Sequence, residues 1–389
     1  MATGVLNPIW VDDAARVTDL CGRAREAAVV GVDTEADSFH SYFHKLCLIQ
    51  LSFGGEHALI DPLALGRDEL RPFADLLADP QVEKILHGAD YDVRVLQRDL
   101  GARVVRLADT QVAAQLLGEP QTGLAALVAK ELGVELDKRY QRADWGERPL
   151  PPGYLAYAAG DTAYLEPLRA RLAERLAALG RTAWWREECA ALESVEWEAP
   201  QPDPLAFERI KGAGRLGGEA RDRLAALHAW RERTAAALDV PPFRVLAAEI
   251  LLALAQKPPA DLAQLAATPG VGSSTVRRHG RALLETLAHP PAAPPRGERR
   301  RFAPDKVKEK RVRQAREARD GVAAALGLEP GVLGPRAALE LIAERMPDGE
   351  AGLEDCLARR WRAAVLAPAL LPVIAGWRGG ADGGGAEPH

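Results

Sequence analysis

The stretch Ala27-Ala28-Val29-Val30-Gly31-Val32-Asp33-Thr34-Glu35 combines an apolar, β-branched run with two carboxylates at its end. This composition predicts a buried strand over residues 27–32 that ends at Asp33. Side chains two positions apart point to the same face of a strand, so Asp33 and Glu35 should lie side by side. Adjacent carboxylates repel each other unless a cation lies between them. The stretch therefore predicts a site for a hard cation such as Mg²⁺, with a solvated strand end as the simpler alternative.

The residues that follow predict an α/β domain over about the first 180 positions. Further strands are expected where short apolar runs end at a turn residue or an aspartate, at 46–53, 57–60, 84–87 and 104–107. Helical spacing of apolar residues predicts helices at 70–77, 90–100, 110–117, 123–132 and 153–179. Strands come first in this order, and helices then prevail.

The second half of the chain is predicted to be all helical. Ala235–Leu238 with Val240 and Pro242 recurs 88 residues later as Ala323–Leu326 with Leu328 and Pro330, which indicates two copies of one small helical domain. Proline-rich stretches mark the boundaries. The expected organisation is an α/β domain (1–198), a first helical domain (204–289), a linker (290–304), a second helical domain (305–378) and a disordered tail (379–389).

The net charge of −5 hides an asymmetry. Residues 1–200 hold 21 Lys+Arg and 32 Asp+Glu, whereas residues 201–389 hold 29 and 23. An acidic half that could hold cations is thus joined to a basic half that could face an anion.

Met1–Trp10 lacks a signal pattern, and no run reaches the ~18 apolar residues of a membrane helix. The four scattered cysteines favour neither zinc nor disulfides, so a reducing cytoplasm is expected, with no membrane and no evident stable protein partner.

Two further places carry carboxylates at suggestive positions. Asp92 lies at a strand-to-helix junction, where an aspartate often only complements the helix dipole. Tyr157 and Asp161 are four residues apart on a predicted helix and so share a face; each alone could be an ordinary surface or half-buried side chain. His87 is expected to be a structural histidine of the core.

The combination resembles the DEDD superfamily of exonucleases, in the branch with Tyr in the third motif, and within it the ribonuclease D family. The stretches that carry the resemblance are Val32–Glu35, Leu48–Leu51, Leu59–Pro62, Leu86–Asp92, Leu136–Lys138, Arg142–Trp145, Arg148–Leu150 and Tyr157–Asp161. Gly160 stands where the family more usually has Ala, and little consequence is expected from one small residue replacing another.

The helical half supports the same resemblance. Leu224–Leu254, with Trp230-Arg231-Glu232 and Pro241-Pro242, is similar to the helicase-and-RNase-D C-terminal (HRDC) domain; the second copy lacks the Trp and matches weakly. The resemblance implies a ribonuclease-H-like exonuclease domain, with a mixed sheet flanked by helices, followed by two small all-α HRDC-like domains.

The resemblance and the carboxylate pattern together imply hydrolysis of RNA from its 3′ end with two divalent ions, Mg²⁺ or Mn²⁺, releasing nucleoside 5′-monophosphates. The metal ligands would be Asp33, Glu35, Asp92 and Asp161, and Tyr157 would orient the attacking water. Substrate contacts are expected from Gln50, Lys138 and Arg142, each of which could equally be an ordinary polar surface or strand residue. Precursors of tRNA are the expected substrates.

Two other functions remain open from the sequence. A DNA 3′→5′ exonuclease would use the same carboxylates, because the motifs do not reveal 2′-hydroxyl contacts. An inactive RNA-binding adaptor is the third interpretation, although all four carboxylates are present. The basic segment Arg296–Asp320, with 11 Lys+Arg against 5 Asp+Glu, is expected either to bind RNA phosphates or to act as a solubilising linker.

Overall fold

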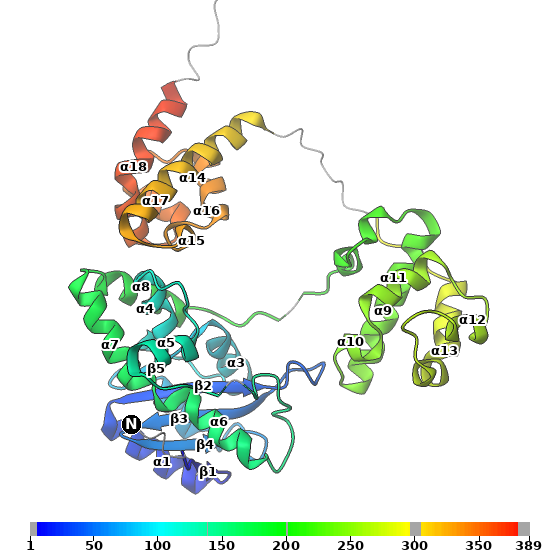
Figure 1. Ribbon diagram of the computed structural model, residues 1–389, viewed down its shortest axis with the longest axis horizontal. Coiled ribbons are helices and arrows are strands. Elements are labelled where there is room, and N and C mark those ends of the chain that lie inside the picture. Colours follow the sequence, from blue (N-terminus) through cyan, green and yellow to red (C-terminus); the bar gives the residue numbers. More distant parts are fainter. Residues whose placement is uncertain (1–5, 138, 200, 296–304, 380–389) are drawn as a thin grey trace, which may run out of the picture.

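A computed structural model describes residues 6–137, 139–199, 201–295 and 305–379. Within these residues the N-terminal domain is built on a six-stranded mixed sheet of order β1-β4-β3-β2-β5-β6 (Figure 1). The strands are β1 (Ile9–Val11), β2 (Val29–Ala36), β3 (Leu46–Phe53), β4 (Glu56–Ile60), β5 (Glu83–Leu86) and β6 (Leu107–Asp109). The hairpins β2–β3 and β3–β4 are antiparallel, whereas β1–β4, β2–β5 and β5–β6 are parallel. The predicted α/β fold with a mixed sheet is confirmed.

The central strand β2 is longer than predicted. It continues past Asp33 to Ala36, because β3 pairs with it along this whole length, with Asp33 opposite Gln50 and Glu35 opposite Leu48. A register irregularity between Glu35 and Ala36 ends the regular pairing. The two carboxylates therefore belong to the strand itself, where pairing with β3 fixes their backbone, rather than to a loop after it.

Eight helices accompany the sheet in the described part of this domain. They are α1 (Ala14–Ala27), α2 (Arg71–Leu77), α3 (Asp90–Leu100), α4 (Thr110–Leu116), α5 (Leu124–Leu132), α6 (Pro152–Ala163), α7 (Leu165–Ala178) and α8 (Thr182–Glu193). The prediction of one helix over 153–179 was wrong, because the chain leaves helical geometry at Tyr164. The strand predicted at 104–107 lies instead at Leu107–Asp109, and β1, α1 and α8 were not predicted.

Helix α6 lies directly on the sheet, in contact with β2, β3 and β4. Gly31 makes this approach possible: a Cβ there would lie 3.0 Å from the carbonyl oxygen of Thr162 and 3.4 Å from Leu165. Only glycine allows so close a backbone contact without displacement of the helix. The glycine of β2 thus sets the height of α6, and with it of Asp161, above the strand that carries Asp33.

The helical half contains two sets of five helices in the described residues. The first set is α9 (Gly218–Leu238), α10 (Pro242–Val245), α11 (Ala248–Gln256), α12 (Leu262–Ala266) and α13 (Ser273–Ala288), preceded by the 3₁₀ turns Ala206–Arg209 and Ala213–Arg215. The second set is α14 (Lys306–Leu326), α15 (Pro330–Leu333), α16 (Arg336–Arg345), α17 (Glu350–Leu357) and α18 (Arg360–Gly379).

The first four helices of the two sets begin 88 residues apart, the interval that the sequence repeat predicts. The match extends to a buried arginine: Arg231 donates to the carbonyl oxygen of Leu246, and Arg319 donates to that of Gly334. In each set the arginine joins the long first helix to the chain after the short second helix. The internal repeat is therefore visible in the helices and in a shared side-chain contact.

The two sets are attached to the N-terminal domain in different ways. The first set has its own core, around Phe207, Leu227 and Leu251, and the N-terminal domain reaches it through Tyr42. The second set shares one continuous core with the N-terminal domain, where Trp361 stacks on Trp184 with ring centroids 4.6 Å apart. No helix among the described residues is long and apolar enough to cross a membrane.

Candidate active site

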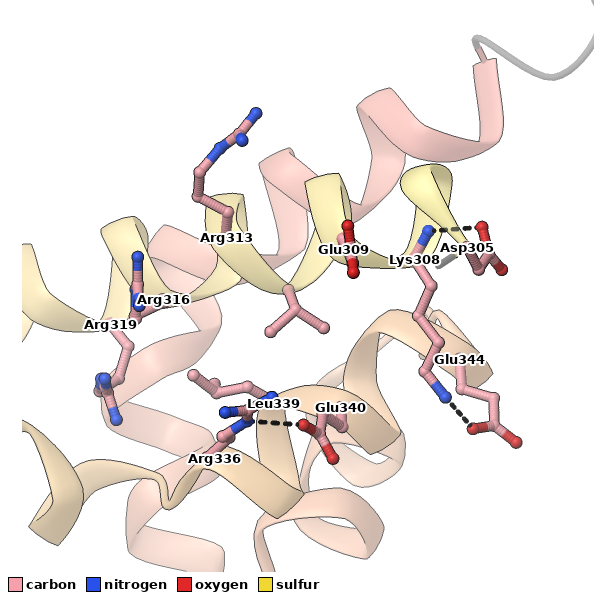
Figure 2. A pocket seen from close by; sticks show the side chains of 11 residues that line it. Asp305, Lys308, Glu309, Arg313, Arg316, Arg319, Arg336, Leu339, Glu340 and Glu344 are labelled. Atoms are coloured by element: carbon pink, nitrogen blue, oxygen red, sulfur yellow. Dashed lines mark hydrogen bonds and ion pairs between the residues drawn. The ribbon is translucent and has the colours of Figure 1, made fainter. Parts of the chain in front are cut away.

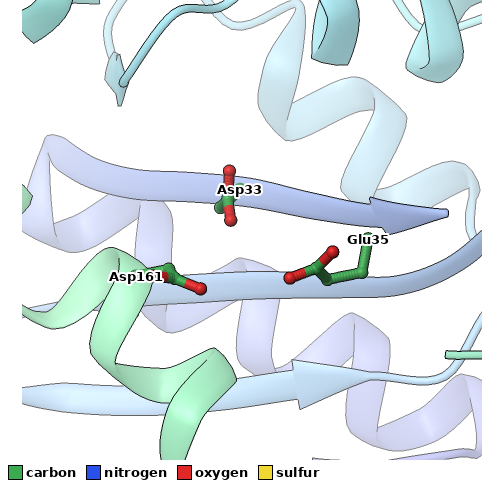
Figure 3. Close-up of side chains that lie close together, drawn as sticks. All are labelled: Asp33, Glu35 and Asp161. Carbon is green, nitrogen blue, oxygen red and sulfur yellow. The ribbon is translucent and has the colours of Figure 1, made fainter. Parts of the chain in front are cut away.

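Three carboxylates gather above the centre of the sheet (Figure 3). Asp33 and Glu35 project from the same face of β2, and Asp161 projects toward them from α6. One carboxylate oxygen from each of the three lies within 4.8 Å of the others. The structure thus brings the two carboxylates of the β2 stretch together with the carboxylate that lies much later in the sequence, on α6. Three half-buried carboxylates so close together form a compact set of oxygen donors.

The electrostatics of this cluster call for a cation. Burial, followed by the charges of Asp92, Asp161 and Glu35, holds the pKa of Asp33 well above its usual range. Burial and the neighbouring carboxylates raise the pKa of Glu35 to about 9, and burial raises that of Asp161 to about 7. In the described structure no lysine or arginine forms an ion pair with these three side chains. The donor set therefore fits hard divalent cations, whose charge would offset the repulsion.

Asp92 occupies a different position from the other three. It is 6% exposed, lies in the first turn of α3, and its carboxylate accepts a hydrogen bond from the hydroxyl of Thr34. It does not belong to the group of oxygens within 4.8 Å. Its charge still contributes to the raised pKa of both Asp33 and Glu35. Asp92 thus borders the cluster and is oriented by Thr34 rather than by the three carboxylates.

Tyr157 stands one helical turn before Asp161. Its phenol is hydrogen-bonded to Asp161, and its pKa is raised above the ordinary value near 10, first by burial and then by the nearby carboxylates. The hydroxyl therefore stays protonated at neutral pH and acts as a donor. Two rings fix its orientation: Tyr140 meets it edge-on at 5.8 Å, and Trp145 lies 6.0 Å away between centroids.

Arg148 ties the segment that carries these two rings to β3 and to the residue that follows β4. Its guanidinium donates to both oxygens of Asp61, at 2.8 and 2.7 Å, and to the carbonyl oxygens of Cys47 and Trp145. Bidentate pairing of this kind is strong and directional. Arg148, Asp61 and Trp145 therefore support Tyr157, a role that spacing in the sequence did not reveal.

A pocket of about 310 Å³ opens over the carboxylates. Its lining includes Leu124 and Gln141, which were not predicted, and His87. His87 shares a hydrogen bond of 2.9 Å between its Nδ1 and the hydroxyl of Thr110, and burial lowers its pKa. This contact is the structural role expected for it. The neighbouring turn is held by Asp109, whose carboxylate accepts the N–H groups of Gly88 and Ala89, another support that the sequence did not indicate.

The three predicted substrate-binding residues have different surroundings. Gln50 is 0% exposed, and its amide atoms have no hydrogen-bond partner among the described residues. It lies opposite Asp33 in the β2–β3 pairing, and its contact with a nucleotide stays a prediction. Arg142 is exposed, with its guanidinium 5.8 Å from the ring centroid of Phe39. Lys138 lies outside the described residues.

Gly160 has no atom within 4 Å of where a Cβ would stand, in accord with the small effect expected there.

The described part of the basic segment forms the start of α14 and lines a groove of about 1060 Å³ against α16 (Figure 2). Acidic side chains accompany the basic ones: Lys308 pairs with Glu344 and Arg336 with Glu340, both at 2.7 Å. Glu309 lies on the same groove. This compensation favours the solubilising alternative for residues 305–320, and residues 296–304 lie outside the described structure.

Family models match two parts of the chain. Residues 8–177 match the model described as 3'-5' exonuclease, and residues 220–287 match the HRDC domain. The first match contains every carboxylate of the cluster, and the second covers the first set of helices.

Curated relatives extend the match over most of the chain. Ribonuclease D of Acidiphilium cryptum is 36% identical over 74% of this chain and 73% of its own length. Ribonuclease D of Pseudomonas paraeruginosa is 33% identical over 94% and 97%. Among solved structures, Escherichia coli RNase D, an exoribonuclease involved in structured RNA processing, superimposes with a TM-score of 0.67 at 27% identity, covering 95% of this chain and 99% of that one.

Proposed function

The chain belongs to the ribonuclease D family and is a 3′→5′ exoribonuclease, and from that premise we propose how its residues act and on which RNA. The proposed metal ligands are Asp33, Glu35, Asp92 and Asp161, which would hold two divalent ions, Mg²⁺ or Mn²⁺. The observation that carries this proposal is the group of three carboxylates within 4.8 Å, with raised pKa values and no cationic partner in the described residues. Bound there, such ions lower the pKa of a water molecule and stabilise the leaving 3′ oxygen.

The protein's own groups then divide the remaining work. Glu35 and Asp33 lie on a paired strand, so their positions are preorganised before substrate arrives. Tyr157 is protonated and packed between aromatic rings, which suits a donor that holds the attacking water in place. Asp92 accepts the hydroxyl of Thr34 on one carboxylate oxygen, Oδ1, so its other oxygen would remain available as a metal ligand.

We assign RNA with a single-stranded 3′ end as the substrate and 5′-mononucleotides as the products, with tRNA precursors as the natural RNA and the cytoplasm as the place of action. The support is the family membership and the similarity over nearly the whole chain to an exoribonuclease involved in structured RNA processing. The second set of helices, α14–α18, is proposed to be a second HRDC-like domain, because its helices repeat those of the first at a constant interval.

A digestion assay tests this assignment. A tRNA transcript with a short 3′ extension and a 5′ label should shorten one nucleotide at a time in Mg²⁺ and stop at the folded acceptor stem. The same extension on a single-stranded DNA of equal sequence is expected to shorten far more slowly. Equal rates on DNA would replace the proposed substrate class, and internal cuts would refute exonucleolytic action.

A further inference from the structure

We propose that a surface beside the catalytic pocket binds the single-stranded RNA upstream of the cleaved bond, by stacking its bases on phenylalanines and pairing its phosphates with arginines. The surface, called here the phenylalanine rim, consists of Phe39 and Phe43 from the β2–β3 loop, Arg142, and Phe243 and Arg244 from α10. The inference rests on the proposed function and adds a binding site to it.

The phenylalanines of the described chain fall into two groups. Phe53, Phe73 and Phe207 are at most 4% exposed, as expected for core residues. Phe39, Phe43 and Phe243 are 49%, 63% and 59% exposed, and all three lie where the β2–β3 loop meets α10. Single exposed apolar residues are ordinary, but a gathering of exposed aromatic rings marks a surface for binding.

The rim adjoins the pocket through two connections. The β2–β3 loop begins directly after β2, the strand that carries Glu35, and reaches toward α10 (Figure 1). On the other side, Arg142 lies over the ring of Phe39 at 5.8 Å, and its neighbour Gln141 lines the pocket. An RNA strand whose 3′ end enters the pocket would therefore pass Phe39 and Arg142 first.

The loop is held in place by hydrogen bonds at its base and at its tip. At the base, the carboxylate of Asp37 accepts from the hydroxyl of Ser41 at 2.6 Å and from the N–H of Lys45 at 2.8 Å. At the tip, Asp239, the residue after α9, accepts the N–H groups of Tyr42 and Phe43, both at 3.0 Å. Phe39 and Phe43 are thus presented on a framework that spans two domains, which reduces the entropy lost on binding.

His40 completes this framework. Arg244 donates to its Nδ1 at 2.9 Å, and its Nε2 lies 3.1 Å from the carbonyl oxygen of Arg142. Because the guanidinium of Arg244 only donates, Nδ1 is the acceptor and the proton is on Nε2. One histidine thereby links the β2–β3 loop, the segment before α6 and the first set of helices.

The charge of the rim fits an anion. Within the described chain, neither Arg142 nor Arg244 forms an ion pair with a carboxylate. The acids nearby are already engaged: Asp239 accepts two backbone N–H groups, and Asp144 lies 3.5 Å from His40 and accepts from Gly146. Exposed guanidinium groups interleaved with aromatic rings are the combination that binds single strands, with phosphates on the arginines and bases on the rings. Such stacking is tolerant of base sequence.

Length dependence separates the rim from the pocket. A dinucleotide is expected to occupy the pocket without reaching the rim, whereas a ten-nucleotide RNA is long enough to reach both. We expect Phe43→Ala and Phe243→Ala each to lower kcat/KM for the ten-nucleotide RNA about tenfold relative to the dinucleotide, since removing one stacking ring weakens binding by that order. Arg244→Gln should reduce the salt slope of binding by about 1.

Matched variants show whether the loss is due to the aromatic ring itself. Phe243→Tyr retains the ring and should restore the preference for the longer RNA, and Leu262→Ala, which removes another exposed apolar side chain from the first set of helices, should leave it intact. Thermal melting reports whether each variant folds. An equal loss on both substrates, no loss on either, or a changed oligomeric state without a change in RNA kinetics would overturn the proposal. Failure of the wild-type protein to cleave either RNA would instead count against the proposed function.

Discussion

The candidate catalytic pocket and the phenylalanine rim adjoin each other and carry opposite charges. In the pocket, Asp33, Glu35 and Asp161 bring negative charge together without a cation among the described residues. On the rim, Arg142 and Arg244 hold positive charge beside exposed rings, and neither pairs with a carboxylate of the part of the chain that the structure describes. The pocket is built on a paired strand and a buried helix face, whereas the rim is built on a loop and on a separate set of helices.

This difference indicates that the reacting groups and the RNA-binding groups are carried by different kinds of element. Groups that must meet within a few ångströms are carried by β2 and α6, whose separation Gly31 fixes. Groups that follow a strand of RNA are carried by a loop and by helices that are joined through hydrogen bonds to His40 and Asp239 and through the packing of Tyr42. Substitutions in the two regions should therefore change different kinetic constants.

The largest effect is expected in the pocket. Asp33→Asn removes one negative charge from the centre of the proposed metal site, and we expect cleavage to fall on the order of a thousandfold or more. RNA affinity should stay within about twofold, because the arginines of the rim are untouched. Single-turnover cleavage and fluorescence anisotropy on the same RNA measure the two quantities. Loss of affinity equal to the loss of rate would remove the distinction between the regions.

The carboxylates of the pocket were predictable, because chemistry fixes the residue types and the strand or helix fixes their spacing. Asp33 and Glu35 share a face by strand periodicity, and Tyr157 and Asp161 share one by helix periodicity. Their meeting in one place follows from the packing of α6 on β2, β3 and β4, which Gly31 allows to be close.

The supports of the site were not predictable in the same way. Arg148 and Asp61 are 87 positions apart, and the local periodicity of the sequence does not predict that they form an ion pair. The continuous core shared by the N-terminal domain and α14–α18 likewise depends on tertiary contacts such as Trp184 with Trp361. Gln50 stays a prediction: it is buried opposite Asp33 in the β2–β3 pairing, a placement that its position in the sequence did not indicate.

A smaller effect is expected for Tyr157→Phe. The substitution keeps the ring between Tyr140 and Trp145 and removes only the hydroxyl, so folding should be unaffected. Positioning of a reacting water contributes about a hundredfold to kcat, and that loss should appear without a change in KM. Since the phenol is protonated at neutral pH, the wild-type rate should show no step attributable to its ionisation. A change confined to KM would place Tyr157 in RNA binding instead.

The smallest effect concerns stability against pH. Without metal, the folded state holds the pKa of Asp161 at about 7 and of Glu35 at about 9, above the unfolded values near 4. The folded protein therefore binds more protons than the unfolded chain, so its free energy of unfolding should fall as pH rises through this interval.

Calorimetry in EDTA should accordingly show Tm decreasing by roughly 5 °C between pH 5 and pH 8. Added Mn²⁺ should reverse the decrease mostly at the higher pH, where the carboxylates are charged, and Asp161→Asn should flatten the curve. A metal-free protein that becomes more stable from pH 5 to pH 8 would contradict the electrostatic account of the pocket.

One measurement tests most directly whether catalysis depends on the pocket and RNA affinity on the rim. The kcat and KM of Asp33→Asn and Phe243→Ala are determined side by side on one ten-nucleotide RNA in Mg²⁺, with Kd for the slow variant taken from anisotropy. We expect Asp33→Asn to lose kcat and keep its affinity, and Phe243→Ala to keep kcat at saturating RNA and lose affinity. If both variants change the same constant, either kcat or the affinity, the pocket and the rim do not have the separate roles proposed.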